Sequence, residues 1–426
     1  MRTCVGRLRL PIVIMLVAAL FVPQRGGAYS VLTHEELIDL AWIGSIRPLL
    51  LARFPGSTDA QLLEAHAYAY GGCAIQDMGY YPFGPKFFSD LTHYARTGDF
   101  IDNLFREART LNEYAFAIGA LSHYVGDSIG HSDATNPATA IAFPKLERKY
   151  GPIVTYDESP HGHVRTEFAF DIGQLTKRGF APPAYLRFIG FKVPRALLGR
   201  AFLETYGFDI HEVLGRPHPA LKSYRSSVRS FIPRFAEAEV VLHRHQFAPD
   251  APSAAYGTFS ERISRTAYDR HWAHTYRDPG FGAHMLAIVI RVLPKIGPIS
   301  LLAIKIPDAK TEGWYIASVN RTVDIYRGML DTLRTSGSAA LPLPNRDLDT
   351  GNIVKPGAYP LTDKTYAKLL DRLTSKPSRS LPAGLRQNIL AYYADPNAPI
   401  TTKKNAKAWK RVRSELQTLR QMKSVD

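Results

Sequence analysis

Apolar positions recur every three or four residues through most of the chain, with polar positions between them. This spacing is typical of helices that bury one face, whereas the alternating pattern of half-buried strands is scarce. The pattern predicts a helix that opens near Thr33 and further helices near residues 58–70, 86–108, 111–131, 161–175, 183–204, 218–245, 311–335, 361–374, 384–394 and 403–423. We therefore expect an all-α fold.

Local signals divide this helical pattern into two regions. Thr33 and Glu36 have the spacing of a capping box, which predicts the start of the first helix. Loops rich in Gly, Pro, Asn and Asp occupy residues 79–87 and 341–360. The composition also shifts at 247–258, and 426 residues exceed what one core usually serves. We expect a catalytic domain over residues 29–247 and a helical C-terminal region of unknown role over residues 258–426.

The first 28 residues have the pattern of a signal peptide. Three arginines precede the apolar run Leu10–Val22, which is too short to span a bilayer comfortably. Gly26 and Ala28 supply the small residues that a signal peptidase reads. Cleavage after Ala28 would make Tyr29 the first residue of a secreted or periplasmic protein; an uncleaved anchor is the alternative.

Charge and cysteine content narrow the class of protein. Loss of residues 1–28 removes four arginines and no acid, which lowers the formal net charge from +15 to +11. This balance favours phosphate-rich partners, either anionic lipid or nucleic acid. Cys73 would be the only cysteine of the processed chain, which excludes a scaffold held by intramolecular disulfides. The apolar segment 284–307 is interrupted by charged residues, Gly and Pro, so we expect it to be buried in protein rather than in a membrane.

Two motifs place metal-binding side chains on single helix faces. His123, Asp127 and His131 follow one another at four-residue steps, and His163 and Glu167 repeat that step. Residues four apart on a helix lie one above the other, so each set points in one direction. Either motif alone can be an ordinary surface pair. Together they indicate a divalent ion such as zinc, because a buried carboxylate is costly unless it is paired or bound to metal.

Further candidates precede these motifs, at His34, Asp77 and His93. At this point the chain resembles a known family, the zinc-dependent phospholipases C, whose multi-helix all-α fold is shared by the S1/P1-type nucleases. The resemblance covers Tyr29 to about residue 245. It lies in the ordered set Tyr29, His34, Asp77, His93, His123, Asp127, His131, His163 and Glu167.

The resemblance implies three zinc ions per chain, and it distributes the candidates among them. The first ion would take Asp77, His93, His123 and Asp127. The second would take His131, His163 and Glu167. The third would take His34, Asp127 as a bridging carboxylate, and the free amine and carbonyl of Tyr29, which only signal cleavage exposes. By the same resemblance Asp77 is the catalytic residue that orients or deprotonates the attacking water. We expect Asp133 or Asp171 to hold ligand imidazoles from a second layer.

Three functions follow from this reading. The first is a phospholipase C that hydrolyses glycerophospholipids at a membrane surface to diacylglycerol and a phosphorylated headgroup. The second is a single-strand nuclease with the same three ions, for which nucleic acid would be the substrate. The third is a non-catalytic helical binding protein stabilised by zinc. Glu167 is the phospholipase-like choice of last ligand, whereas Tyr29 replaces the Trp that usually begins the family's processed chain. No protein partner is implied.

Overall fold

A computed structural model describes residues 30–215, 217–247, 253–272, 278–294, 303–337 and 341–425. The signal-peptide prediction and Tyr29 fall outside these residues. The described chain is all-α, as expected, and its only extended pairings are two isolated bridges. Within the described residues, every helix is too short or too polar to cross a lipid bilayer.

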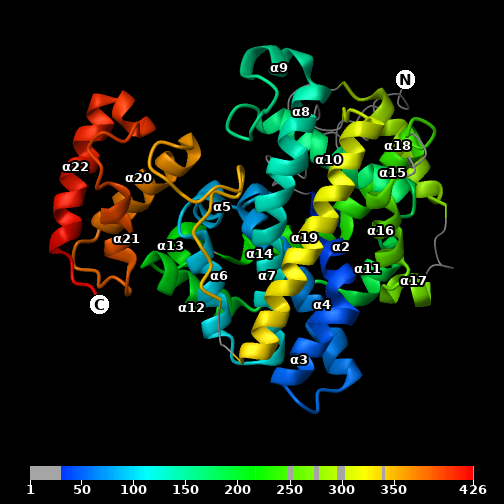
Figure 1. Cartoon of the computed structure of the whole chain (residues 1–426), viewed down its shortest axis with the longest axis horizontal. Coiled ribbons are helices and arrows are strands. Elements are labelled where there is room, and N and C mark those ends of the chain that lie inside the picture. The colour runs from blue at the N-terminus through cyan, green and yellow to red at the C-terminus, as the bar shows by residue number, and fades with distance from the viewer. Residues whose placement is uncertain are drawn as a thin grey trace, which may run out of the picture.

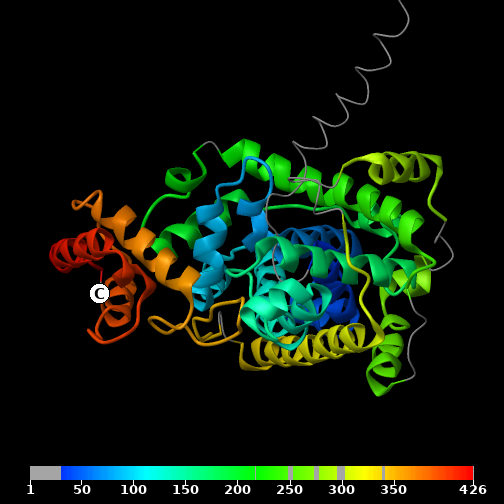
Figure 2. The same cartoon turned by 90° about the horizontal axis from the view of Figure 1, so that it is seen from above.

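The helices surround α7 and α4, which lie side by side at the centre, while α20 to α22 lie at one end of the molecule (Figures 1 and 2). Their bounds are α2 Val31–Ala41, α3 Arg47–Arg53, α4 Asp59–Cys73, α5 Lys86–Tyr94, α6 Thr97–Glu107, α7 Leu111–Gly130, α8 Asn136–Ala142, α9 Pro144–Tyr150, α10 Pro160–Thr176, α11 Pro183–Ile189, α12 Arg195–Tyr206, α13 His211–Leu214, α14 Pro217–Ser226, α15 Ile232–His243, α16 Ala254–Ile263, α17 Ala267–Trp272, α18 Phe281–Val292, α19 Ala309–Ser336, α20 Pro360–Thr374, α21 Leu385–Tyr392 and α22 Ala406–Gln421. Short turns of tighter or wider helix join them at η1 Trp42–Ile46, η2 Ile75–Tyr80, η3 His131–Thr135, η4 Ser227–Phe231 and η7 Thr401–Lys404.

Several expected helices are divided where the backbone leaves the helical region. The range 86–108 breaks at Arg96, whose φ of 53° is left-handed. The range 183–204 breaks at Gly190, with φ 86°, before a second helix starts at Arg195. The capping box was a wrong prediction, because α2 begins at Val31 and the Thr33 hydroxyl donates to Asp171 instead. Periodicity alone does not reveal such breaks, since both halves continue the same apolar spacing.

The central pair of helices packs through glycine. A Cβ added at Gly72 of α4 would lie 2.1 Å from the carbonyl oxygen of Phe116, and one added at Gly119 of α7 would lie 2.1 Å from that of Ala69. The two backbones can approach this closely only because neither glycine has a side chain. This contact sets the position of α7, which carries two of the candidate metal ligands and is followed directly by a third.

The chain beyond residue 303 packs onto the region before 247. Helix α19 runs across the front of Figure 1 and contacts α7, α2 and α3. Part of the 341–360 loop crosses α6 and α7, where Tyr124 donates to the carbonyl of Pro344 and Thr97 to that of Arg346. The boundary that we predict at 247–258 stays a prediction. The later residues nevertheless share one continuous core with the earlier ones.

We predict that Gly119→Ala destabilises the fold, because the new methyl group must displace the α4 backbone. Overpacking of this kind costs about 1–3 kcal/mol of unfolding free energy, measurable by urea denaturation. Gly313→Ala in α19 is the matched control, since nothing lies within 4 Å of its added Cβ. That change should stabilise the protein by about 0.5–1 kcal/mol, and equal effects at both positions would contradict the close-packing argument.

Candidate metal centre

Six elements deliver the eight described candidate ligands to the interior. His34 comes from α2, Asp77 from η2 and His93 from α5. Helix α7 supplies His123 and Asp127, and His131 begins the wider turn η3 that follows it. Helix α10 supplies His163 and Glu167. All eight side chains are buried. Tyr29 lies outside the described residues, and His161, the neighbour that could have competed with His163, is exposed.

Asp127 is the centre of the larger group. Its two carboxylate oxygens lie 3.2 Å from Nε2 of His34, 3.4 Å from that of His93 and 3.1 Å from that of His123. The rings of His34 and His123 stack with centroids 4.2 Å apart. Oδ1 of Asp77 lies 3.3 Å from Nε2 of His93 and 4.0 Å from that of His123. His123 therefore stands between two sets of possible ligands, one with His34 and Asp127 and one with Asp77 and His93.

The second group is formed by His131, His163 and Glu167. Oε1 of Glu167 lies 2.9 Å from Nε2 of His163 and 3.5 Å from Nε2 of His131. The two imidazole rings meet edge to face, with centroids 4.6 Å apart. One carboxylate oxygen and two ring nitrogens thus converge on one point, and they belong to the residues that the resemblance assigns to the second ion.

Backbone carbonyls fix the orientation of three imidazoles. Nδ1 of His93 lies 2.8 Å from the carbonyl oxygen of Ser89, and Nδ1 of His123 lies 3.0 Å from that of Cys73. Nδ1 of His131 lies 2.7 Å from the carbonyl oxygen of Leu348. A carbonyl can only accept, so each Nδ1 donates its proton and each Nε2 is left as the ligand atom. This is how metal-binding histidines are usually held.

The two acids that we expected to hold imidazoles, Asp171 and Asp133, bind other groups. Asp171 accepts hydrogen bonds from the backbone N–H groups of Leu32 and Thr33, both at 3.1 Å, so it caps the first turn of α2. Asp133 pairs with Arg321 of α19 at 2.5 Å. Nearness in sequence was a poor guide, because the partners of these acids come from distant parts of the chain, α2 for Asp171 and α19 for Asp133.

Burial and neighbouring charge shift the pKa values of these groups. Burial lowers the pKa of His131 to about 4, so the ring is neutral near neutral pH. Burial also acts to lower the pKa of His93, but Asp127 and Asp77 outweigh it and raise that pKa to about 10. For Asp127 burial is again outweighed, here by His123 and its other imidazole neighbours, and the pKa falls well below its usual value. Metal binding at His93 therefore has to displace a proton.

Several polar atoms of the centre lack hydrogen bonds that a divalent cation could replace. Asp77 Oδ1, both oxygens of Asp127, His131 Nε2 and Glu167 Oε1 are buried, and none of them makes a hydrogen bond with a described residue. Leaving such atoms unsatisfied is costly, and the cost is removed when they bind a cation. Imidazole nitrogens with carboxylate oxygens form a donor set that suits zinc.

The loop after α19 contributes to the centre, which the sequence reasoning did not foresee. Besides the Leu348 carbonyl, Asp349 brings Oδ1 to 3.5 Å from Nδ1 of His131. Tyr359 donates to the Asp349 carboxylate, and Leu348 N–H donates to the carbonyl of His93 at 3.0 Å. The available signal was length, since a structureless loop of about 20 residues within a compact protein is usually functional.

Comparison with known families agrees with this geometry. Residues 33–211 match the family described as zinc dependent phospholipase C, and that range contains all eight described ligands. Comparison with curated proteins and with solved structures gave no match. The centre is that of a zinc-dependent hydrolase. It is residues 33–211, less than half of the chain, that are similar to the zinc-dependent phospholipase C family.

We predict that Asp127→Asn lowers both bound zinc and hydrolytic activity, because one neutral amide replaces the carboxylate that three imidazoles share. The loss of activity should be about 100-fold or more, measured together with zinc content by metal analysis. Asp133→Asn is the control, since that acid is partly exposed and pairs with Arg321. Full zinc content and activity in Asp127→Asn would refute the assignment.

A second prediction concerns the loop that holds His131. Gly351 has φ 71°, and a Cβ added there would lie 2.1 Å from the carbonyl oxygen of Ser128, so Gly351→Ala should displace Leu348. Zinc affinity should fall about 10- to 100-fold in a titration against a competing chelator. Gly384→Ala shares the positive φ, 72°, but meets nothing within 4 Å. The loop has no supporting role if both variants bind zinc like the unchanged protein.

Proposed function

We propose that the processed protein is a secreted or periplasmic phospholipase C that hydrolyses glycerophospholipids to diacylglycerol and a phosphorylated headgroup. The observation that carries this proposal is the set of three buried ligand groups, all inside the part of the chain that matches the family. Nothing in the comparisons favours the nuclease alternative.

The chain's own residues prepare the centre for phosphodiester hydrolysis. Zinc held by these groups would supply Lewis acidity toward the phosphate oxygens and a water molecule of lowered pKa. Asp77 would orient that water and accept its proton, a role supported by its Oδ1, which lies beside the Nε2 atoms of His93 and His123. The carbonyls behind the imidazoles keep the ligand atoms pointing inward, so little reorganisation is needed when charge develops on the phosphate.

Signal cleavage is the second part of the proposal, because the resemblance assigns the amine of Tyr29 to the third ion. Two observations support it. Asp171 anchors the first turn of α2 through Leu32 and Thr33. The carbonyl of Ser30 accepts from the N–H of Thr33 at 3.0 Å. Ser30, the residue that follows Tyr29 in the sequence, is therefore fixed one turn before His34, which supports a role for the amine that cleavage would create.

The test uses the chain that begins at Tyr29, loaded with zinc. We expect it to release phosphorylcholine from phosphatidylcholine in mixed micelles and to leave single-stranded DNA intact, with Asp127→Asn as the blank. Removal of zinc with a chelator should abolish the activity, and added zinc should restore it. Cleavage of DNA alone would move the protein to the nuclease class, and inactivity on both substrates with zinc bound would favour a structural metal centre.

A chain with one additional alanine before Tyr29 is the control for the N-terminus. It keeps every side chain but moves the free amine, so the expected result is a loss of one equivalent of zinc and of most activity. Equal zinc content and equal activity in the two chains would remove the amine from the ligand set without affecting the other two groups.

A further inference from the structure

Helix α18 has apolar side chains on two opposite sides. Ala287 and Ile290 form a small core with Phe235 and Ala238 of α15, and Ala283 on the same side of α18 is also buried. Phe281, Met285, Ile288 and Val292 follow one another at steps of four, three and four, which places them in one stripe on the other side. The stripe is open to solvent, with Phe281 82% and Val292 79% exposed. A helix that is apolar on both sides normally has both sides covered.

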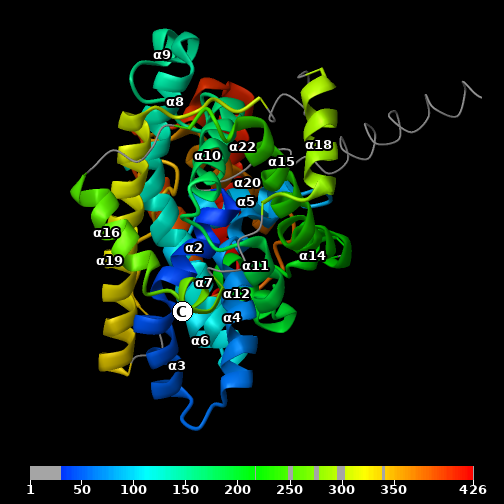
Figure 3. The same ribbon diagram turned by 90° about the vertical axis from the view of Figure 1, so that its right-hand side faces the viewer.

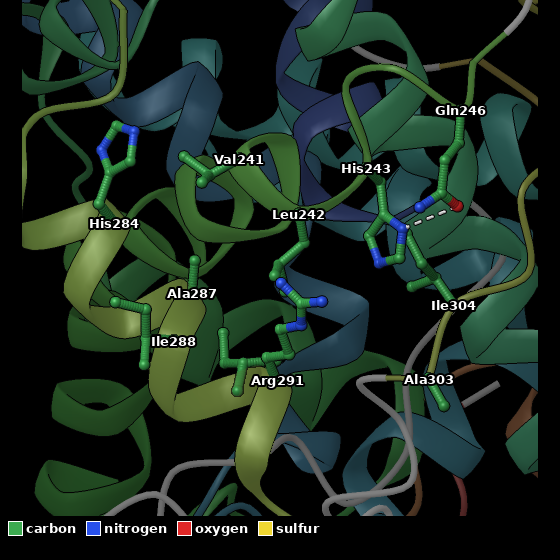
Figure 4. A pocket seen from close by; sticks show the side chains of 11 residues that line it. Val241, Leu242, His243, Gln246, His284, Ala287, Ile288, Arg291, Ala303 and Ile304 are labelled. Carbon is green, nitrogen blue, oxygen red and sulfur yellow. Dashed lines mark hydrogen bonds between the residues drawn. The ribbon is translucent and has the colours of Figure 1, made fainter.

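A groove of about 520 Å³ separates α18 from the end of α15 (Figure 4). Ile288 and Arg291 lie along its α18 wall, whereas Leu242 and His243 form the α15 wall. Nδ1 of His243 lies 3.2 Å from Oε1 of Gln246. Arg291 thus stands beside the apolar stripe rather than within it. An apolar stripe with a basic residue at its border is the pattern of helices that lie in a lipid interface.

A basic pocket lies farther along the same continuous helix. α14, η4 and α15 follow one another without a break, and a cavity of about 480 Å³ opens beside α14 and η4. Its charged lining consists of Arg195, Lys222, Arg225 and Arg229, and the hydroxyl groups of Ser226 and Ser230 complete it. No described carboxylate lines this cavity. Positive charges gathered around one cavity favour an anion there.

The loop that follows η2 adds a third element to this side of the molecule. Tyr81 packs against Tyr224 of α14, with ring centroids 5.3 Å apart, so the loop lies next to the basic pocket. Phe83 at its tip is 75% exposed. The same segment carries Asp77 into the metal centre. α14, α15 and α18 lie along one edge in both Figure 2 and Figure 3.

We propose that this edge docks the protein on a phospholipid bilayer. The α18 stripe and Phe83 enter the apolar layer, and the pocket of Arg195, Lys222, Arg225 and Arg229 takes the phosphate of an anionic lipid headgroup. A bilayer is the occupant that matches both features, because it presents an apolar interior beneath a layer of phosphates. Docking in this orientation brings the Asp77 segment toward the membrane. The proposal deepens the phospholipase function and rests on it for the choice of lipid.

Two variants separate the apolar part from the charged part. Phe281→Ser/Ile288→Ser/Val292→Ser removes the stripe, and Lys222→Gln/Arg229→Gln halves the charge of the pocket. Matched controls are Ile325→Ser on α19, at the opposite side of the molecule, and Lys407→Gln/Lys410→Gln on α22. All changed positions are exposed, so thermal unfolding should be unaffected.

Binding is measured by sedimentation of the zinc-loaded chain with vesicles of non-cleavable phosphonate lipids, zwitterionic alone or mixed with anionic lipid. We expect the stripe variant to lose binding to both vesicles by about tenfold or more. The pocket variant should lose only the preference for anionic vesicles and its dependence on salt. Controls should bind as the unchanged chain does.

Activity on two substrates separates this proposal from the phospholipase assignment. Hydrolysis of monomeric short-chain phosphatidylcholine should be the same in all variants, whereas hydrolysis of vesicles should fall with binding. Absence of hydrolysis of the monomeric lipid would refute the phospholipase function while leaving the binding result intact. Unchanged vesicle binding in both variants would overturn the docking proposal, as would conversion of a dimer to a monomer by the stripe variant without any change in binding.

Discussion

The carboxylate of Asp127 is the point on which the arrangement of the interior depends. It is fully buried, and three imidazoles from α2, α5 and α7 face its oxygens. Without a cation this concentration of polar groups opposes folding, because each has lost its water and few have gained hydrogen bonds. With a cation the same groups bind the helices together. Metal affinity and the stability of the helix assembly are therefore two measures of one interaction.

Helix α7, which carries Asp127, is positioned by two glycines at its contact with α4. Gly72 and Gly119 let α4 and α7 meet backbone to backbone, and that contact also places the Cys73 carbonyl behind His123. The position of a ligand is thus determined by a packing contact one helix away. At α2, the Asp171 carboxylate accepts hydrogen bonds from the N–H groups of Leu32 and Thr33, and this contact fixes the helix that carries His34.

Features carried by local spacing could be predicted from the sequence, and features made by distant contacts could not. The four-residue steps indicated which ligands share a helix face, and helical periodicity indicated an all-α fold, whereas the grouping of ligands from different helices was implied only by the family resemblance. The apolar residues of segment 284–307 predicted burial, yet only one side of α18 is buried. The role of Leu348 could not be foreseen, since a backbone carbonyl leaves no mark on the residue that supplies it.

The Leu348 carbonyl orients a ligand that is synthesised long before it. Leu348 lies 217 positions after His131, the residue whose ring it orients. A chain growing from its N-terminus has all eight described ligands when Glu167 is complete, but the ring of His131 has no acceptor until the late loop emerges and folds back. The hydrolytic centre is thereby tied to nearly complete synthesis. The support of His131 in the second metal group is in this way complete only after most of the chain has been made.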